Sequence, residues 1–394
     1  MRNPLPNDWR EATLLGRIQT SEGPTPILIR EGRVYDISRF APTTAEFATK
    51  WSGQQDVLGK DLGDLATAFD MTPVWARANG GQPRATLISP LDLQCIKASG
   101  VTFAISAVER VIEERCRGDF NAAQGIRSSL SDRIGGDIRL VKPGTEQAAR
   151  LKQALIAGGL WSQYLEVAIG PDAEIFTKSQ VMSSVGYGAY VGVRGDSEWN
   201  NPEPEVVLLC NREGKCIGAT LGNDVNLRDI EGRSALLLGK AKDNNASCGV
   251  GPFVRLFDST FTMDDVRSSV VELEIEGMEG YRLTGSSSMS QISRDPEELI
   301  GQTIGRNHQY PDGFALFLGT MFAPIEDRDV PGRGFTHKEG DVVRISTPKL
   351  GVLENKVTSC EKAPRWQFGI GDLMRNLASR GLLGADSASS RSAS

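Results

Sequence analysis

Residues 201–252 decide how this chain folds and carry its most unusual chemistry. They contain three segments, NPEPEVVLL at 201–209, GNDVNLRD at 222–229 and KAKDNNASCGVGP at 240–252. Short apolar runs follow or flank each polar group, and glycines separate them, as in consecutive strands joined by turns. We therefore expect a hairpin-rich β structure in which charged side chains stand at strand ends.

Three carboxylates in this stretch have a spacing that favours a shared site. Glu203 and Glu205 stand two residues apart just before an apolar run, so in a strand both project from one face. Asp224 follows about one hairpin later, and converging oxygen donors suit a hard cation such as Mg²⁺. The alternative is a pair of solvated acidic positions at a strand end, with Asp224 capping a turn. The residues by themselves leave both interpretations open.

The composition indicates an ordinary globular protein of more than one domain. The chain has 394 residues, of which 39% are hydrophobic and 24% charged. A formal net charge of -6 argues against nucleic acid or an anionic membrane as partner. No apolar run approaches the ~20 residues of a membrane-spanning helix, and the N-terminus lacks the apolar region of a secretory signal. We expect a cytoplasmic protein.

Cysteine and histidine usage narrows the chemistry further. The six cysteines include no CxxC pair, which favours free thiols over a zinc site or a disulfide framework. The only two histidines are His308 and His337, so a catalytic triad or a multi-histidine metal site would depend on these two alone.

The pattern along the chain predicts an α+β protein with two domains and a tail. Residues 1–90 are expected to form a small α+β domain, and residues 91–375 a larger domain. Within the larger domain, 91–160 are expected to be a helical lead-in and 161–360 to be rich in β structure. Residues 376–394 are expected to be a disordered tail, because five of the last ten residues are serine and apolar content is low.

A series of short motifs between residues 100 and 360 resembles the fumarylacetoacetate hydrolase superfamily. Each motif is weak alone, but their order is specific. The motifs are Phe176-x-Lys178, Glu203-x-Glu205, Asn223-Asp224-Val225, Lys242 before Gly251-Pro252, Gly319-Thr320, Gly340-Asp341, and Leu350-Gly351 leading to Asn355. Longer phrases at 161–172 and 240–248 are similar to bacterial dehydratases of 2-keto-3-deoxypentonates, in non-phosphorylating xylose and arabinose degradation.

The resemblance implies that residues 91–375 form a metal-dependent catalytic domain, in which 161–360 are a β-rich roll of mixed sheets. It also implies specific site residues. Glu203, Glu205 and Asp224 would hold one Mg²⁺, with Mn²⁺ as a possible substitute. Lys242 matches the active-site lysine when counted back from Gly251-Pro252, although the Lys-x-x-Asp spacing would place it at Lys240. Substrate contacts would come from Gly319, Thr320 and Lys178, the last of which could instead be a surface lysine at a strand end.

One departure from the hydrolytic members of the superfamily bears on the reaction. Those members use a His-x-x-Glu dyad to activate water, whereas this chain has no histidine before His308 and offers Glu113 and Glu114 instead. The resemblance therefore implies a Mg²⁺-dependent dehydratase that forms 2,5-dioxopentanoate, with Lys242 as base and Glu114 or Glu113 as acid. The alternatives are an acylpyruvate hydrolase or oxaloacetate decarboxylase, and a non-catalytic 2-keto-acid-binding protein. A homodimer or homotetramer is also implied.

Overall fold

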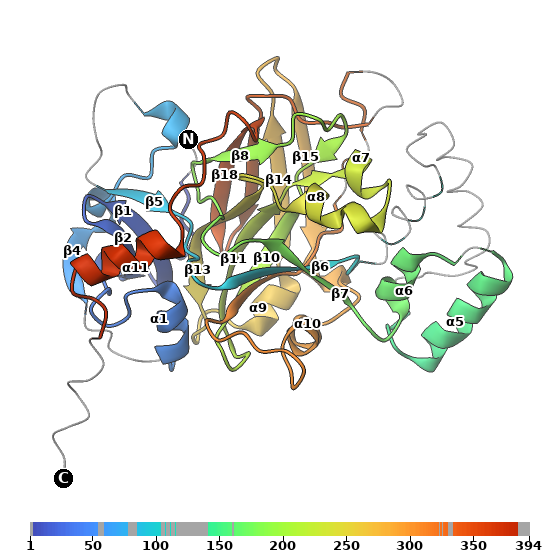
Figure 1. Ribbon diagram of the computed structural model, residues 1–394, viewed down its shortest axis with the longest axis horizontal. Coiled ribbons are helices and arrows are strands. Elements are labelled where there is room, and N and C mark those ends of the chain that lie inside the picture. Colours follow the sequence, from blue (N-terminus) through green and yellow to red (C-terminus); the bar gives the residue numbers. More distant parts are fainter. Residues whose placement is uncertain are drawn as a thin grey trace, which may run out of the picture.

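The structure is a computed structural model. It describes residues 3–53, 59–77, 85–103, 107, 111, 115, 141–159, 161–322, 324, 326–329 and 334–384. Within these residues the chain folds around two large β-sheets of mixed strand direction, with helices around them (Figure 1).

The larger sheet joins the N-terminal strands to the centre of the molecule. In the described residues it has 11 strands in the order β4-β3-β2-β1-β13-β11-β10-β16-β6-β7, with β5 also bonded to β1. Its strands are β1 (Leu14–Thr20), β2 (Gly23–Arg30), β3 (Arg33–Asp36), β4 (Lys60–Asp64), β5 (Ala85–Ile88), β6 (Cys95–Gly100), β7 (Glu174–Ser179), β10 (Pro204–Cys210), β11 (Cys216–Asp224), β13 (Cys248–Leu256) and β16 (Phe314–Phe317).

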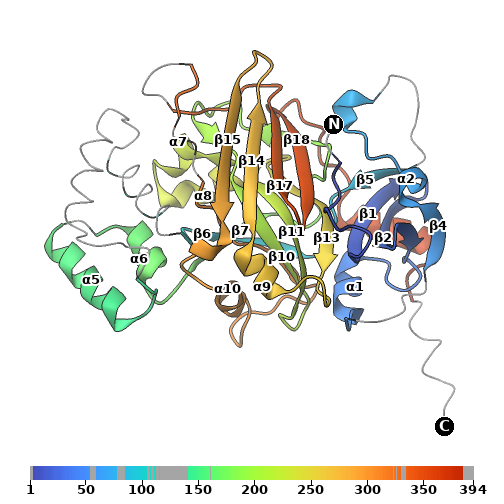
Figure 2. The same ribbon diagram turned by 180° about the vertical axis from the view of Figure 1, so that it is seen from behind.

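A second sheet stands beside the first, as the view from behind shows (Figure 2). It has five strands in the described residues, in the order β15-β14-β17-β18-β8. They are β8 (Tyr190–Val193), β14 (Val270–Glu276), β15 (Arg282–Ser288), β17 (Val342–Thr347) and β18 (Gly351–Ser359). A short ladder pairs β9 (Asn200–Asn201) with β12 (Asn226–Leu227).

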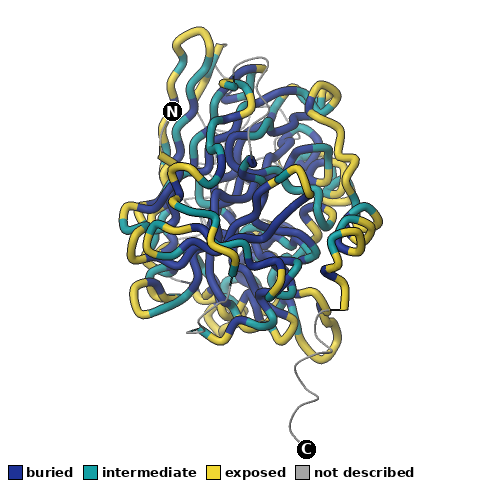
Figure 3. Tube along the Cα trace, turned by 90° about the vertical axis from the view of Figure 1, so that its left-hand side faces the viewer, coloured by how far each residue is buried: buried dark blue, intermediate teal, exposed yellow. Residues whose placement is uncertain are grey.

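The central hairpin of β10 and β11 is buried almost throughout. All seven residues of β10 and eight of the nine in β11 are buried, because β10 is bonded to β16 on one side and β11 to β13 on the other. A strand with neighbours on both edges and cover on both faces needs an apolar run without alternation, and Val206, Val207, Leu208 and Leu209 supply it. Figure 3 shows that buried residues fill the interior of the trace and that exposed residues lie mostly at its periphery.

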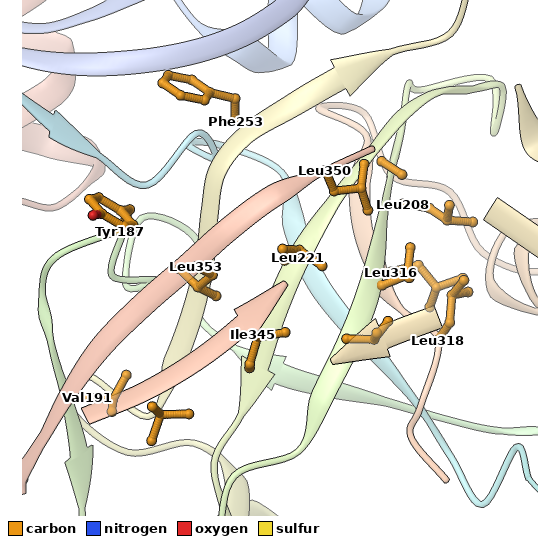
Figure 4. Close-up of a cluster of buried hydrophobic side chains, with 14 of the residues drawn as sticks. Tyr187, Val191, Leu208, Leu221, Phe253, Leu316, Leu318, Ile345, Leu350 and Leu353 are labelled. Atoms are coloured by element: carbon orange, nitrogen blue, oxygen red, sulfur yellow. The ribbon is translucent and has the colours of Figure 1, made fainter. Parts of the chain in front are cut away.

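The main hydrophobic core lies between the two sheets. Leu208, Leu221 and Leu316 from the larger sheet meet Ile345 and Leu353 from the smaller one (Figure 4). All five are at most 1% exposed. At about 25 cal/mol per Å² of apolar surface, this burial is the main stabilisation that fixes the sheets against each other.

Helices surround the two sheets, and Phe47 of α1 lies in one buried cluster with Leu15 and Leu28 of the larger sheet. They are α1 (Thr44–Lys50), α2 (Leu65–Ala68), α5 (Glu146–Ala157), α6 (Gln163–Ile169), α7 (Arg228–Glu231), α8 (Leu238–Lys242), α9 (Met263–Ser268), α10 (Pro296–Thr303) and α11 (Ile370–Ser379), with 3₁₀ turns at Val74–Ala76, Ala235–Leu237 and Met289–Gln291. Helix α11 returns to the N-terminal strands, where Asn376 Nδ2 donates to Glu22 O (Figure 1). None of the described helices is long and apolar enough to cross a bilayer.

The α+β class with mixed sheets is confirmed, and two local expectations are corrected. Residues 163–169 were expected to open the β-rich region but form helix α6, because the Ser162 side chain caps it and accepts from Tyr164 N. The tail cannot start at 376, because α11 extends to Ser379 and buries Leu373 and Leu377. Strand β6 lies inside the predicted helical lead-in. The boundary at residue 90 stays a prediction, and β1 is bonded directly to β13 across it.

Candidate functional site

Three carboxylates meet at one end of the β10–β11 hairpin. One oxygen from each of Glu203, Glu205 and Asp224 lies within 4.8 Å of the others. Their exposed fractions are 8%, 3% and 2%. Since the cluster is buried, the solvated-strand-end alternative does not describe these residues.

The strand register explains why the three side chains converge. Glu205 lies opposite Gly222 in the antiparallel pair, and Asp224 N donates to Glu203 O at 3.0 Å. Gly319 completes the arrangement, since its N–H donates to Glu205 Oε2 at 2.6 Å. Gly319 has φ +87, and a Cβ there would overlap Thr102 Oγ1, so this position requires glycine.

Two buried lysines pair with this cluster. Lys242 Nζ, at the end of α8, lies 2.5 Å from Glu203 Oε2 and 3.1 Å from Asp224 Oδ2. Lys178 Nζ, from β7, lies 3.0 Å from Asp224 Oδ1 and donates to the backbone oxygen of Lys242 at 2.5 Å. Both lysines are at most 3% exposed. Lys178 therefore links Asp224 to the segment that carries Lys242.

The charges at the cluster are only partly balanced. Burial, followed by repulsion from Asp224 and Glu203, raises the pKa of Glu205 well above its ordinary value. Burial also acts to raise the pKa of Asp224, but Lys178 and Lys242 outweigh it and lower that pKa. Two ammonium groups thus stabilise Asp224 as a carboxylate while Glu205 remains unfavourable to ionise.

The donor set fits a hard divalent cation. Three buried carboxylates provide the oxygen ligands that such ions prefer, and Glu205 lacks sufficient compensating positive charge. Asn201 Oδ1 and Asn226 Oδ1 are buried without a hydrogen-bond partner in the described part of the chain, and both residues line the same pocket. These residues could therefore hold a metal ion, with Glu203, Glu205 and Asp224 as ligands.

Strand β7 places three side chains along the site at a spacing of two residues. Glu174 and Phe176 line the pocket, and Lys178 reaches Asp224, as expected for alternate residues on one strand face. Lys242 Nζ lies 5.9 Å from the centre of the Phe176 ring. The carboxylate of Glu174 lies over Gly100, where a Cβ would overlap its Oε2. Glu174 is thus a carboxylate on the pocket wall, apart from the buried cluster.

The remaining wall comes from α7 and the segment after β16. Arg228 and Glu231 line the pocket from α7, and Thr320 lines it next to Gly319. The Arg228 guanidinium lies 4.3 Å from the Trp199 ring centre and donates to Pro324 O at 3.2 Å. The pocket therefore combines anionic, cationic and hydroxyl groups around the carboxylate cluster.

The structure brings together most of the residues that the sequence singled out. The three carboxylates, Lys242, Gly319 and Thr320 line one pocket. Lys178 is fully buried behind Asp224 and is absent from the described lining. Glu113 and Glu114 lie outside the described residues. No described residue that lines this pocket is a histidine.

Glu174, Arg228 and Glu231 line the pocket but were not identified as site residues from the sequence. Glu174 stands two and four residues before Phe176 and Lys178, so extending the strand periodicity would have indicated it. No comparable signal marks Glu231, because its place on the wall depends on the position of the short helix α7.

Comparison of the sequence with protein-family models finds a match to about half of the chain. Residues 169–358 match the family described as fumarylacetoacetate (FAA) hydrolase C-terminal. This region contains all three carboxylates of the cluster, both buried lysines and Glu174.

Two relatives carry dehydratase names. The chain is 33% identical over 196 residues to a probable 2-keto-3-deoxyxylonate dehydratase of Haloferax volcanii, covering 50% of this chain and 64% of the relative. It is 32% identical over 192 residues to a 2-dehydro-3-deoxy-D-arabinonate dehydratase of Saccharolobus solfataricus, covering 48% of this chain and 60% of the relative. The matches thus span less than two thirds of either relative.

Solved structures share the fold. The apo form of a 2-keto-3-deoxy-D-arabinonate dehydratase superposes with a TM-score of 0.62 at 22% identity, covering 88% of this chain and 99% of that one. A structure of 2-keto-3-deoxy-D-arabinonate dehydratase complexed with magnesium and 2,5-dioxopentanoate gives a TM-score of 0.61 at 22% identity, with the same coverage. At this identity the likeness concerns the fold.

Proposed function

We propose that this chain, whose residues 169–358 match the family described as fumarylacetoacetate (FAA) hydrolase C-terminal, is a Mg²⁺-dependent dehydratase of 2-keto-3-deoxypentonates. The reaction removes water from the sugar acid and yields 2,5-dioxopentanoate. The observation that carries the proposal is the buried cluster of Glu203, Glu205 and Asp224 with Lys242 Nζ 2.5 Å from Glu203. The names of the two relatives support the choice of substrate class.

The elimination of water needs two proton movements, and the pocket offers two groups for them; the later rearrangement moves further protons, from C5 to C3 and from the enol oxygen to C4. One proton leaves C3, and the hydroxyl at C4 leaves as water after it gains a proton. The unsaturated product then rearranges to the dioxo acid without any redox change. A positioned acid and base contribute roughly 10²–10⁴-fold each to such steps.

We assign the C3 proton to Lys242, acting as a neutral amine, and the proton for the leaving hydroxyl to Glu174, acting as a neutral carboxylic acid. In the structure Lys242 pairs with Glu203 and Asp224, and a cation held by these carboxylates would compete with that pairing and favour the neutral amine. Lys242 is the lysine on the pocket lining, next to the three carboxylates, whereas Lys178 lies behind them. Glu174 is a half-buried carboxylate on the same strand face as Phe176, which lies beside Lys242. This gives Glu174 the role that the sequence suggested for Glu113 or Glu114, which lie outside the described residues.

A bound Mg²⁺ would polarise the keto group and stabilise negative charge that develops on its oxygen. Glu203, Glu205 and Asp224 would hold it, and Mn²⁺ suits the same oxygen ligands. Thr320 lines the pocket beside Gly319 and is the proposed contact for the carboxylate of the keto acid.

The assay that tests the proposal is turnover of 2-keto-3-deoxypentonate in Mg²⁺ buffer, followed by coupling 2,5-dioxopentanoate to an NAD(P)⁺-dependent aldehyde dehydrogenase. The two proton steps are separated by deuterium exchange at C3 in D₂O. Lys242→Met is expected to lose both exchange and product. Glu174→Gln is expected to keep exchange and lose product formation by about 10²-fold or more.

Lys240→Met is the matched control, because Lys240 is 40% exposed and pairs with Asp196 outside the pocket. It should retain wild-type turnover. A wild-type protein that forms no dioxo acid but cleaves an acylpyruvate or decarboxylates oxaloacetate would overturn the proposed reaction. Tight binding of the keto acid without any turnover would instead favour a binding protein.

A further inference from the structure

Arg294 is a fully buried arginine that pairs with Glu298 of α10 through Nη1 at 2.7 Å and also bonds to the end of a helix far away in sequence. It is 1% exposed. Its Nη2 donates to the backbone oxygens of Val167 at 2.8 Å, Gly170 at 2.7 Å and Asp172 at 3.3 Å. The last carbonyls of a helix have no partner within the helix, so Arg294 satisfies the groups that the end of α6 leaves open.

Gln302 bonds to the backbone of the same segment after α6, at residues Pro171 and Ala173. Its Oε1 accepts from Ala173 N at 2.5 Å, and its Nε2 donates to Pro171 O at 3.2 Å. Gln302 lies on α10, and Arg294 lies two residues before that helix. Together they bond to the backbone of 167–173, which we call the α6–β7 turn.

The α6–β7 turn leads directly into the pocket wall. Glu174 follows Ala173 and is the first residue of β7, paired in register with Gly100. The segment that carries Arg294 also contacts the chain just beyond the neighbouring strand β6, since Ser293 N donates to Thr102 O at 2.8 Å. Residues 293–302 therefore bond both to the α6–β7 turn, which precedes Glu174, and to Thr102, which follows the strand paired with Glu174.

We propose that Arg294 and Gln302 are positioning residues for Glu174. They act through the backbone of the α6–β7 turn, and neither residue lines the pocket. The physical basis is that the carboxylate must approach a leaving hydroxyl within hydrogen-bond reach, and a shift of about 1 Å can reduce a rate ~10²-fold. This inference rests on the proposed function, in which Glu174 supplies the second proton.

Gln302→Met gives the clearest test, because methionine keeps the side-chain length and removes both bonds to the turn. We expect kcat to fall at least tenfold, with C3 exchange and Mg²⁺ affinity unchanged. Gln309→Met is the matched control: Gln309 Nε2 donates to Gly305 O and Arg306 O, just beyond α10, and does not contact the turn. It should leave turnover at the wild-type level.

A double-mutant cycle with Glu174→Gln distinguishes positioning from a general structural effect. If Gln302 acts through Glu174, adding Gln302→Met to Glu174→Gln lowers kcat no further. Arg294→Lys, which keeps the charge but cannot reach three carbonyls in one plane, should behave like Gln302→Met. Independent losses that multiply in the double variant would overturn the inference.

Hydrogen exchange gives a readout that needs no activity. The Ala173 amide, bonded to Gln302 Oε1, should exchange faster in Gln302→Met while amides of β10 and β11 keep their protection. Unchanged exchange at Ala173 would contradict the role of Gln302. Wild-type protein without dehydratase turnover would contradict the proposed function, whereas wild-type turnover with multiplying losses would contradict the positioning role alone.

Discussion

Lys178 shows how one residue can serve the site without lining it. Its ammonium group is fully buried and contacts Asp224 Oδ1, the Lys242 backbone oxygen and Ser247 Oγ at 3.0, 2.5 and 3.3 Å. These contacts tie three separate segments together. A buried charge of this kind is tolerated because each of its donors has an acceptor, and removing it leaves those acceptors in a low-dielectric interior.

Lys178→Met is therefore expected to lower the free energy of unfolding by about 3–5 kcal/mol, the range for breaking a buried ion pair. Urea denaturation monitored by circular dichroism measures this. Lys240→Met is the control, since its exposed pair with Asp196 should contribute no more than about 1 kcal/mol. Equal effects of the two substitutions would show that Lys178 has no special structural role.

The connection between β16 and β17 carries a buried charged cluster next to the β9 strand. Arg328 bonds to both oxygens of Asp341 at 2.6 and 2.7 Å, and His337 Nδ1 lies 3.4 Å from Asp341 Oδ2. The His337 backbone N–H donates to Asn200 Oδ1 at 3.1 Å. This connection therefore holds the strand that contributes Asn201 to the pocket.

The buried histidine in this connection makes stability depend on pH. Burial is the largest influence and lowers the pKa of His337 from 6.5, although Asp341 opposes it. Because the folded form binds the proton less readily than the unfolded form, stability is complete above about pH 6.5 and declines below it. The slope for one proton is at most about 1.4 kcal/mol per pH unit.

His337→Gln should remove this part of the decline between pH 7.5 and pH 5, as measured by urea denaturation at each pH. Both proteins share all carboxylates, so the difference between their profiles reports on His337. His308→Gln is the control, because His308 is the only other histidine and is exposed. A wild-type profile in His337→Gln would reject the assignment.

At the scale of the whole molecule, the two sheets enclose an acidic cluster that a cation would stabilise. The raised pKa of Glu205, caused first by burial and then by Asp224 and Glu203, reflects charge that the two lysines do not balance. A ligand that binds only the folded state at 100 times its Kd adds about 2.7 kcal/mol of stability. For a chain of this size the melting temperature should rise by a few degrees.

Thermal unfolding with Mg²⁺, Mn²⁺ or added NaCl of equal ionic strength checks this. Glu205→Gln and Asp224→Asn should abolish the divalent shift, and Glu205→Gln without metal should not be less stable than the wild type. Glu272→Gln, an exposed position on the smaller sheet, should keep the full shift. The same shift in Asp224→Asn as in the wild type would place the cation elsewhere.

Much of the candidate site could be predicted from the spacing of residues along the sequence. Particular residues show where such a prediction fails. Glu203 and Glu205 could be assigned to one strand face because side-chain direction alternates with every residue. Glu174 belongs to the same kind of pattern with Phe176 and Lys178, but the periodicity was not extended back to it from Phe176. Helix α6 was mistaken for part of the β region, since a seven-residue apolar segment fits either structure until its cap is recognised.

The sequence by itself determined the α+β class, the buried hairpin at 204–224 and the set of three carboxylates, because strand periodicity and apolar runs are local properties of the chain. Only the tertiary structure decided that Lys178 lies behind Asp224, that Glu174 and Arg228 share the pocket, and that Arg294 holds the turn before β7. These contacts join segments 46 to 127 residues apart. Their geometry depends on strand pairing and packing between distant segments, which spacing along the chain does not specify.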